Sequence, residues 1–233
     1  MHLNGGALMK RIHLFEFTDI KWYPKLFRQM QTDYLQFAAT LGEGHTNILP
    51  LIIKAMKSVG TNEVVDLCSG GTGPWVKLHK QLLEAGWQVK VKLTDKYPTK
   101  SVVEKNKELK AIHMEYLPES IDATCVPPEL KGMRTIFEGF HHFKPEQAKA
   151  ILEDAVKQRA PIGVFDASFK APWGLLLLVL SPIITFLTYL FITPFIKPII
   201  LSRFIFTYLI PVVPIVTCWD GIISMLRIYS AHE

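Results

Sequence analysis

The chain has 233 residues, a hydrophobic share of 49% and a formal net charge of +5. This length suits one α/β domain of about 150 residues with an appendage. The lysines are spread along the chain rather than gathered in one run. That distribution argues against sequence-specific nucleic-acid binding and favours contact with an anionic membrane surface.

The cysteines and the N-terminal residues bear on the compartment. Cys68, Cys125 and Cys218 have no metal-ligand spacing, so we expect no metal site. Their odd number argues against a disulfide scaffold and indicates a reducing compartment. Polar residues such as Glu16 and Asp19 interrupt the first apolar stretch, so we expect no signal peptide.

Two amphipathic helices are predicted before the first strand. Pro24 opens the first helix, and its apolar positions from Leu26 to Leu41 recur every three or four residues. The second helix is expected from about Thr46 to Val59, with Gly60 ending it. We expect residues 1–60 to form a helical cap, which either covers a ligand pocket or only caps the edge of a sheet.

A strand, a glycine-rich turn and a helix are predicted next, and they organise the rest of the chain. The strand is Glu63 to Leu67, and the turn is the segment 68–73, CSGGTG. Glycines allow positive φ angles or the close approach of a ligand, and Pro74 suits the first position of a helix that runs to Gly86. This architecture holds nucleotide-like ligands in α/β folds.

The residues after this turn indicate which nucleotide-like ligand it suits. A second strand, Gln88 to Thr94, ends in Asp95, which lies 22 residues after Gly73. A carboxylate about 20 residues beyond a glycine loop is typical of a ribose-binding group. Val76 stands where a dinucleotide fingerprint needs its third glycine, so we expect a ligand without a pyrophosphate, such as a nucleoside joined to an amino acid.

These motifs resemble, in order, those of class I S-adenosylmethionine-dependent methyltransferases over residues 44–168. The segment 66–74 resembles their motif I, with one extra residue between the aspartate and the last glycine. Asp95 matches their second-strand acidic residue, and 121–127 resembles the loop after their third strand. The segment 134–142 resembles their fourth strand and the loop that borders cofactor and substrate. The chain is also similar to an uncharacterised bacterial subgroup in which 22–24, 140–143 and 219–221 recur around a hydrophobic insertion.

The resemblance implies a Rossmann-like, mainly parallel sheet over residues 61–170 with helices on both faces, and S-adenosylmethionine as the cofactor. It also implies which residues contact that cofactor: Asp66, Cys68, Ser69, Gly70, Gly71, Gly73, Asp95, Lys96, Asp122, Ala123, Glu138 and Phe140.

Acidic residues stand at the expected ends of all five strands. The fourth strand is predicted over Thr135 to Phe140 and the fifth over Ile162 to Phe165, with a helix from 144–146 to about Arg159 between them. The carboxyl ends of parallel strands meet at one edge, so the following residues would converge on one rim: Asp66, Asp95, Asp122, Glu138 and Asp166. For Asp166 alone, a turn-forming or helix-capping role is the simpler interpretation.

Two histidines are the acid–base candidates near this rim. His141 and His142 follow the fourth strand, and an imidazole can accept a proton from a substrate near neutral pH. The alternative is that one ring caps the strand or packs under the cofactor. Arg134 either has a structural role or holds an anionic group of the substrate.

A long apolar tract departs from the family pattern. Residues 174–196 form 23 positions without a charge, enough for the ~20 that cross a bilayer. After Lys197 and Arg203, the run 204–219 adds 16 uncharged positions with two prolines. We expect residues 171–219 to form a helical hairpin that either crosses the bilayer or is embedded in one leaflet, and two cations near its turn favour shallow insertion. The alternative is a pair of core helices in a soluble protein.

The last segment, 220–233, is expected to hold one strand or a short helix, so that the sheet is short or the chain is a truncated form. Together these expectations describe a membrane-associated methyltransferase with its catalytic domain on the cytoplasmic side. The acceptor would be a small molecule or a lipid, with no nucleic-acid partner. The alternative function is an inactive cofactor-binding scaffold that recruits a partner in the membrane.

Overall fold

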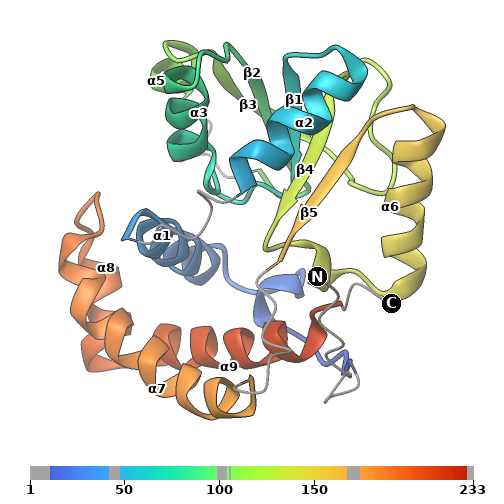
Figure 1. Cartoon of the computed structure of the whole chain (residues 1–233). Helices are drawn as coiled ribbons and strands as arrows, with labels where there is room; N and C mark the ends of the chain where they lie inside the picture. Colours follow the sequence, from blue (N-terminus) through green and yellow to red (C-terminus); the bar gives the residue numbers. More distant parts are fainter. Residues whose placement is uncertain (1–10, 42–47, 99–103, 105, 167–173, 230–233) are drawn as a thin grey trace. The chain divides into compact units, whose positions relative to one another are not determined.

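A computed structural model of the chain describes residues 11–41, 48–98, 104, 106–166 and 174–229. The chain divides into two units, one of Gln36–Asp166 and one of Met1–Leu35 with Ala167–Glu233. Figure 1 labels their elements. The expected start of the second helix at Thr46 and the expected domain boundary near residue 170 lie outside the described residues.

The unit Gln36–Asp166 contains a five-stranded, all-parallel sheet in the order β3-β2-β1-β4-β5, so the α/β prediction is confirmed. Its strands are β1 (Glu63–Leu67), β2 (Lys90–Asp95), β3 (Met114–Ser120), β4 (Met133–Phe137) and β5 (Ile162–Phe165). Its helices are α2 (Leu49–Val59), α3 (Trp75–Glu84), α5 (Asn106–Lys110), the short 3-10 helix η3 (Phe140–His142) and α6 (Pro145–Lys157).

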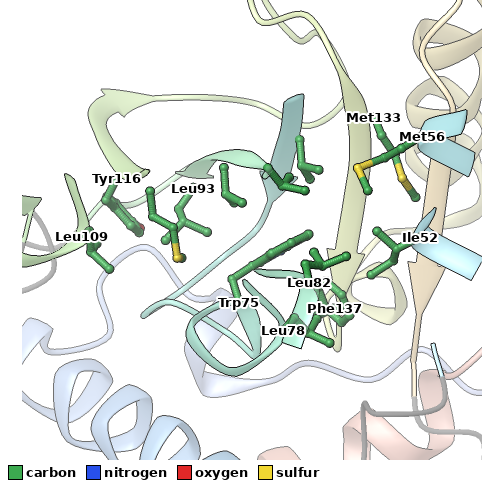
Figure 2. Packing of buried hydrophobic residues seen from close by; sticks show 14 residues of the cluster. Ile52, Met56, Trp75, Leu78, Leu82, Leu93, Leu109, Tyr116, Met133 and Phe137 are labelled. Carbon is green, nitrogen blue, oxygen red and sulfur yellow. The ribbon is translucent and has the colours of Figure 1, made fainter. Parts of the chain in front are cut away.

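Helices cover both faces of this sheet. Successive strand residues point to opposite faces, so each strand contributes side chains to both. Figure 2 shows the apolar cluster on one face, where Ile52 and Met56 of α2 and Trp75 of α3 pack with sheet residues such as Phe137. On β4, Arg134 points the other way and pairs with Asp154 of α6 at 2.8 Å. Helix α2 is therefore part of the core on this face of the sheet.

The predicted elements of this unit occur in the structure, but some of their ends differ. Strand β2 begins at Lys90 rather than Gln88, and β4 begins at Met133 rather than Thr135. Strands β1 and β5 have the expected bounds, and Gly60 ends α2 in the left-handed conformation with φ 65°. Strand β4 ends at Phe137 rather than Phe140, because Glu138 has φ 47° and leaves the extended conformation. Phe140 instead begins η3.

The other unit is helical. Its elements are η1 (Phe17–Asp19), the first part of α1 (Lys25–Leu41), α7 (Gly174–Ile192), η4 (Thr193–Phe195), α8 (Leu201–Phe204), the π-helical turn η5 (Ile205–Leu209) and α9 (Val212–Arg227). Helices α7 and α9 pack against each other. Among the described residues, the window Leu178–Phe195 is long and apolar enough to cross a membrane.

The second arm of the expected hairpin is not one straight helix. The segments Leu201–Leu209 and Val212–Arg227 meet at an angle of 74°. Pro211 at this break donates no backbone hydrogen bond, which permits the bend. Helix α9 also continues to Arg227, so most of the segment after Trp219 is helix, and the alternative of a strand there is wrong.

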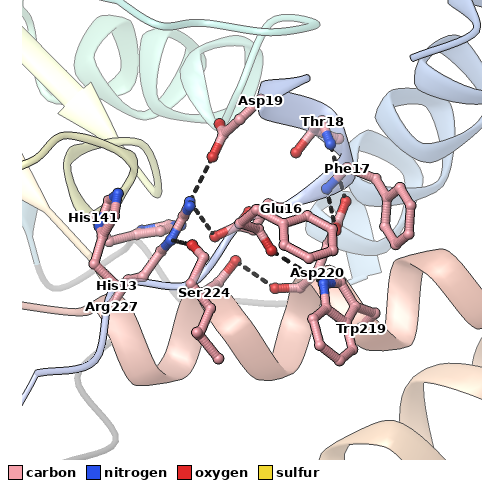
Figure 3. Close-up of polar contacts among 12 residues, drawn as sticks. His13, Glu16, Phe17, Thr18, Asp19, His141, Trp219, Asp220, Ser224 and Arg227 are labelled. Atoms are coloured by element: carbon pink, nitrogen blue, oxygen red, sulfur yellow. Dashed lines mark hydrogen bonds and ion pairs between the residues drawn. The ribbon is translucent and has the colours of Figure 1, made fainter. Parts of the chain in front are cut away.

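Several charged side chains of this unit are buried and hydrogen-bonded within it. Arg227 donates to Glu16 at 2.9 Å and to Asp19 at 2.6 Å, and Asp220 accepts from the backbone N–H of Phe17 at 2.7 Å (Figure 3). Arg203 is fully buried and pairs with Asp33 of α1. Arg203 does lie near the expected turn, where it donates to the Pro198 carbonyl, and its charge is paired with Asp33 inside the unit.

Candidate functional site

Acidic residues occur at the carboxyl end of every strand, as predicted. Asp66 is the fourth residue of β1 and Asp95 the last of β2, while Glu138 and Asp166 directly follow β4 and β5. Asp122 lies two residues after β3. The strand order reverses between β1 and β4, which is where parallel α/β sheets bind ligands.

Asp66 is committed to the loop that follows its own strand. One carboxylate oxygen accepts from the Ser69 hydroxyl at 2.6 Å, and the other accepts from the Thr135 hydroxyl of β4 at 2.6 Å. Burial raises the pKa of Asp66 to about 6, although both hydrogen bonds favour its charged form. Asp66 thus joins β1, β4 and the glycine-rich turn at their common end.

Asp95 holds the glycine-rich turn through its backbone. Its carboxylate accepts from the N–H of Gly70 at 2.9 Å and from the N–H of Tyr97 at 2.7 Å. The hydroxyl of Tyr116 donates to the Gly70 carbonyl at 3.1 Å. A carboxylate has about four acceptor positions, so Asp95 keeps capacity for a further donor.

The glycines of the turn differ in what surrounds them. Gly70 has φ 56°, and a Cβ added there would meet nothing within 4 Å. Gly73 has φ 51°, with the Ser69 carbonyl 4.0 Å from an added Cβ, and Gly71 is buried. The turn therefore leaves open space beside Gly70. The Gln36 side chain donates to the Thr72 hydroxyl at 2.9 Å, which places the end of α1 against this turn.

Two neighbouring strand ends carry strained residues. Cys68 after β1 has φ 60° and Glu138 after β4 has φ 47°, although neither is a glycine. A Cβ on Gly139 would lie 3.2 Å from Cys68 Cβ, so the two chain segments approach closely. Such strain costs about 1–3 kcal/mol per residue and gathers at functional sites.

Electrostatics keep the Cys68 thiol neutral. Burial raises its pKa, and the nearby charges of Asp95, Asp66 and Asp122 raise it further. A thiolate nucleophile is therefore disfavoured at this position. The same carboxylates give this edge of the sheet a negative field that would attract a cationic group.

Asp122 is fixed after the third strand. It accepts from Lys96 at 2.7 Å and from the Thr124 hydroxyl at 2.7 Å. Burial opposes ionisation, but these hydrogen bonds outweigh it and lower the pKa of Asp122 to about 2. Lys96 is therefore engaged with Asp122, and the neighbouring Ala123 is buried.

His141 and Asp166 form a pair across the ends of β4 and β5. Asp166 accepts from the backbone N–H of His141 at 2.9 Å, and its same oxygen lies 3.3 Å from His141 Nδ1. The ring of His142 stacks obliquely on that of His141, with centroids 4.4 Å apart. A carboxylate against Nδ1 orients an imidazole for proton transfer, so His141 is the better placed of the two histidines.

Some of these roles could not be assigned from the sequence. Arg134 is fully buried against Asp154, which favours the structural alternative over an anion-binding role. Thr135 and Tyr116 hold Asp66 and Gly70 through hydroxyls that the sequence analysis did not single out. In the sequence, the only sign of these two roles is a hydroxyl-bearing residue at a strand position whose side chain is buried.

The fold and this site define an α/β unit with an acidic rim and a glycine-rich turn at the carboxyl ends of a parallel sheet. Comparison of the chain with models of protein families, with curated proteins and with solved structures gave no match.

Proposed function

We propose that this chain is a membrane-associated, S-adenosylmethionine-dependent methyltransferase with its catalytic unit on the cytoplasmic side, acting on a small or lipidic acceptor. The main support for the proposal is the structure at the junction of β1 and β4. There the glycine-rich turn, tied to Asp95 through Gly70, lies at the point of the sheet where α/β folds bind ligands.

The donor set fits the proposed cofactor. The open space beside Gly70 would admit a ligand against the backbone, and Asp95 has acceptor capacity for ribose hydroxyls. The carboxylates around Cys68 suit the positive sulfonium. When bound, the cofactor supplies an electrophilic methyl group.

The remaining chemistry belongs to the protein. An in-line attack on a methyl carbon depends mainly on positioning, which the hydrogen-bonded ends of β1 and β4 would provide. His141 would take the proton of the acceptor, and Asp166 would hold the ring in the required orientation. Asp166 is a positioning residue in this scheme.

The test combines cofactor binding with transfer of a labelled methyl group to membrane lipids and metabolites. We expect the wild-type chain to bind S-adenosylmethionine and to label an acceptor, and we expect His141→Gln to lower transfer about a hundredfold or more while binding persists. Asp166→Asn should lower kcat and change the pH profile of the reaction. The exposed Glu84→Gln on α3 is the matched control.

Two results would contradict the proposal in different ways. A wild-type chain that does not bind S-adenosylmethionine refutes the cofactor assignment. Binding without transfer to any fraction would support the inactive scaffold instead.

A further inference from the structure

An exposed apolar stripe runs along α7 and continues beyond it. Side chains four positions apart share one face of a helix, and this stripe is 57–75% exposed at every such position: Val179, Ile183, Leu187, Phe191 and Phe195. Only 17% of the window Leu178–Phe195 is buried, whereas a core helix of a soluble protein would be mostly buried. Further along the chain, Ile199, Leu201 and Leu209 are also exposed.

Several hydroxyl groups of the apolar tract are satisfied within it. Four hydroxyls donate to a carbonyl three or four residues earlier, namely those of Ser181, Thr188, Thr193 and Thr217. The exposed Tyr208 donates to the Leu190 carbonyl, although the buried Thr207 hydroxyl lacks such a partner. Internal pairing of this kind is what a lipid environment demands, because no water is there to replace it.

The opposite side of α7 contacts the amphipathic helix α1. Tyr34 of α1 stacks on Tyr189 with ring centroids 4.2 Å apart, and Tyr189 donates to the Met30 carbonyl at 3.1 Å. Asp33 of α1 pairs with Arg203, which also donates to the Ile196 carbonyl at 2.8 Å. The later half of α7 and the turn that follows it are therefore fastened to α1.

This contact is incompatible with a hairpin that crosses a bilayer. If the turn lay beyond the far leaflet, the α1 residues bonded to it would have to cross the hydrocarbon as well. Helix α1 carries Lys25, Arg28, Gln29 and Asp33, and burying such groups in lipid is costly. The 74° bend also leaves the second arm without a straight span.

We propose that the helical unit is a one-leaflet membrane anchor, in which the α7 stripe and the turn 195–201 enter a single leaflet while α1 stays on the aqueous side. This inference rests on the proposed membrane association and adds its geometry and its lipid-contacting face. The occupant is a bilayer with anionic headgroups. Residues 174–196 have no charge that could specify a protein partner, and the exposed Lys197 lies beside this apolar surface.

The lipid-contacting face is tested by binding of the full chain to vesicles of phosphatidylcholine and phosphatidylglycerol. We expect Leu187→Glu and Phe191→Glu each to weaken sedimentation with vesicles by about tenfold or more. The control is Val156→Glu, which changes an apolar residue of α6 that is at least as exposed and should bind as the wild type does. Circular dichroism and S-adenosylmethionine binding of each variant verify folding.

The depth of insertion is tested with a fluorescent probe on the turn. An environment-sensitive NBD group is attached at Ile199→Cys in a Cys125→Ser background, after cell-free synthesis of the full chain onto preformed vesicles. As a control, the Cys125→Ser chain without Ile199→Cys shows how much probe attaches to Cys68 and Cys218. External dithionite should bleach the probe, because the turn stays in the near leaflet.

Protection of the probe until detergent is added would show a crossing hairpin and overturn the inference. A wild-type chain that does not bind vesicles would overturn it too. Cofactor binding in the same preparation is independent of both results, so a failure of the anchor is distinguishable from a failure of the proposed enzymatic function.

Discussion

The two units use the same charged residue types in opposite ways. In Gln36–Asp166, carboxylates stand at the ends of the strands, and two strained residues, Cys68 and Glu138, lie beside them. In the helical unit, Glu16 and Asp220 are buried and bonded to distant segments of the same unit. In the helical unit, the buried charged groups hold separate segments together. At the sheet edge, by contrast, several carboxylates and two strained residues lie close together, which is typical of a ligand site.

The substitution with the greatest expected loss of stability tests whether buried charges hold the helical unit together. Arg227→Met removes the cation that pairs with Glu16, which is 2% exposed. We expect the free energy of unfolding to fall by about 3–5 kcal/mol, measured by denaturant titration in detergent. Adding Glu16→Gln should restore part of the loss. A change within 0.5 kcal/mol of the wild type, roughly the range of surface substitutions, would show that the pair holds nothing together.

A second prediction concerns the pH dependence caused by Asp66. Its pKa is about 6 in the folded chain against an ordinary value of 3.8, because burial disfavours the charge. The stabilisation from its protonated form is therefore complete below pH 3.8 and is lost as the pH rises to about 6. A difference of about two units corresponds to about 3 kcal/mol.

The measurement for Asp66 is the free energy of unfolding across this pH range. The wild type should lose stability with rising pH relative to Asp66→Asn, which has no proton to release. If the free energy of unfolding changed equally with pH in the two proteins, the assigned burial of this carboxylate would be contradicted.

A third prediction, with a smaller change in stability, compares backbone strain beside the proposed site with backbone strain elsewhere. Glu138→Gly and Arg159→Gly both relieve a positive φ, 47° and 54° respectively. We expect both to raise the free energy of unfolding by about 1 kcal/mol, and only Glu138→Gly to weaken S-adenosylmethionine binding. Equal binding by both variants would mean that the strain at Glu138 is unrelated to a ligand.

Much of the α/β unit could be predicted from sequence because its signals are local. Short apolar runs, one before the glycine-rich turn and one before Asp166, predicted β1 and β5 to the residue. Both ends of β4 were missed, and at its carboxyl end Glu138 adopts a left-handed conformation that no local pattern of the sequence indicates.

The site and the helical unit depended more on such distant contacts. That Asp66 is held by Thr135, and that His141 faces Asp166, follows from the order of the strands rather than from any local motif. In the apolar tract, composition predicted helices but not the 74° bend or the burial of Arg203 against Asp33, because both depend on packing between separate helices.

The most direct test of the account is calorimetric binding of S-adenosylmethionine to Gly70→Ala and Gly60→Ala. Both glycines have left-handed φ angles, 56° and 65°, and an added Cβ meets nothing within 4 Å at either, so both variants should lose similar stability. We predict that Gly70→Ala binds about tenfold more weakly, or about 1.4 kcal/mol, while Gly60→Ala binds as the wild type does. Equal affinity of the two variants, or no binding by the wild type, would contradict the claim that the junction of β1 and β4 is a cofactor site.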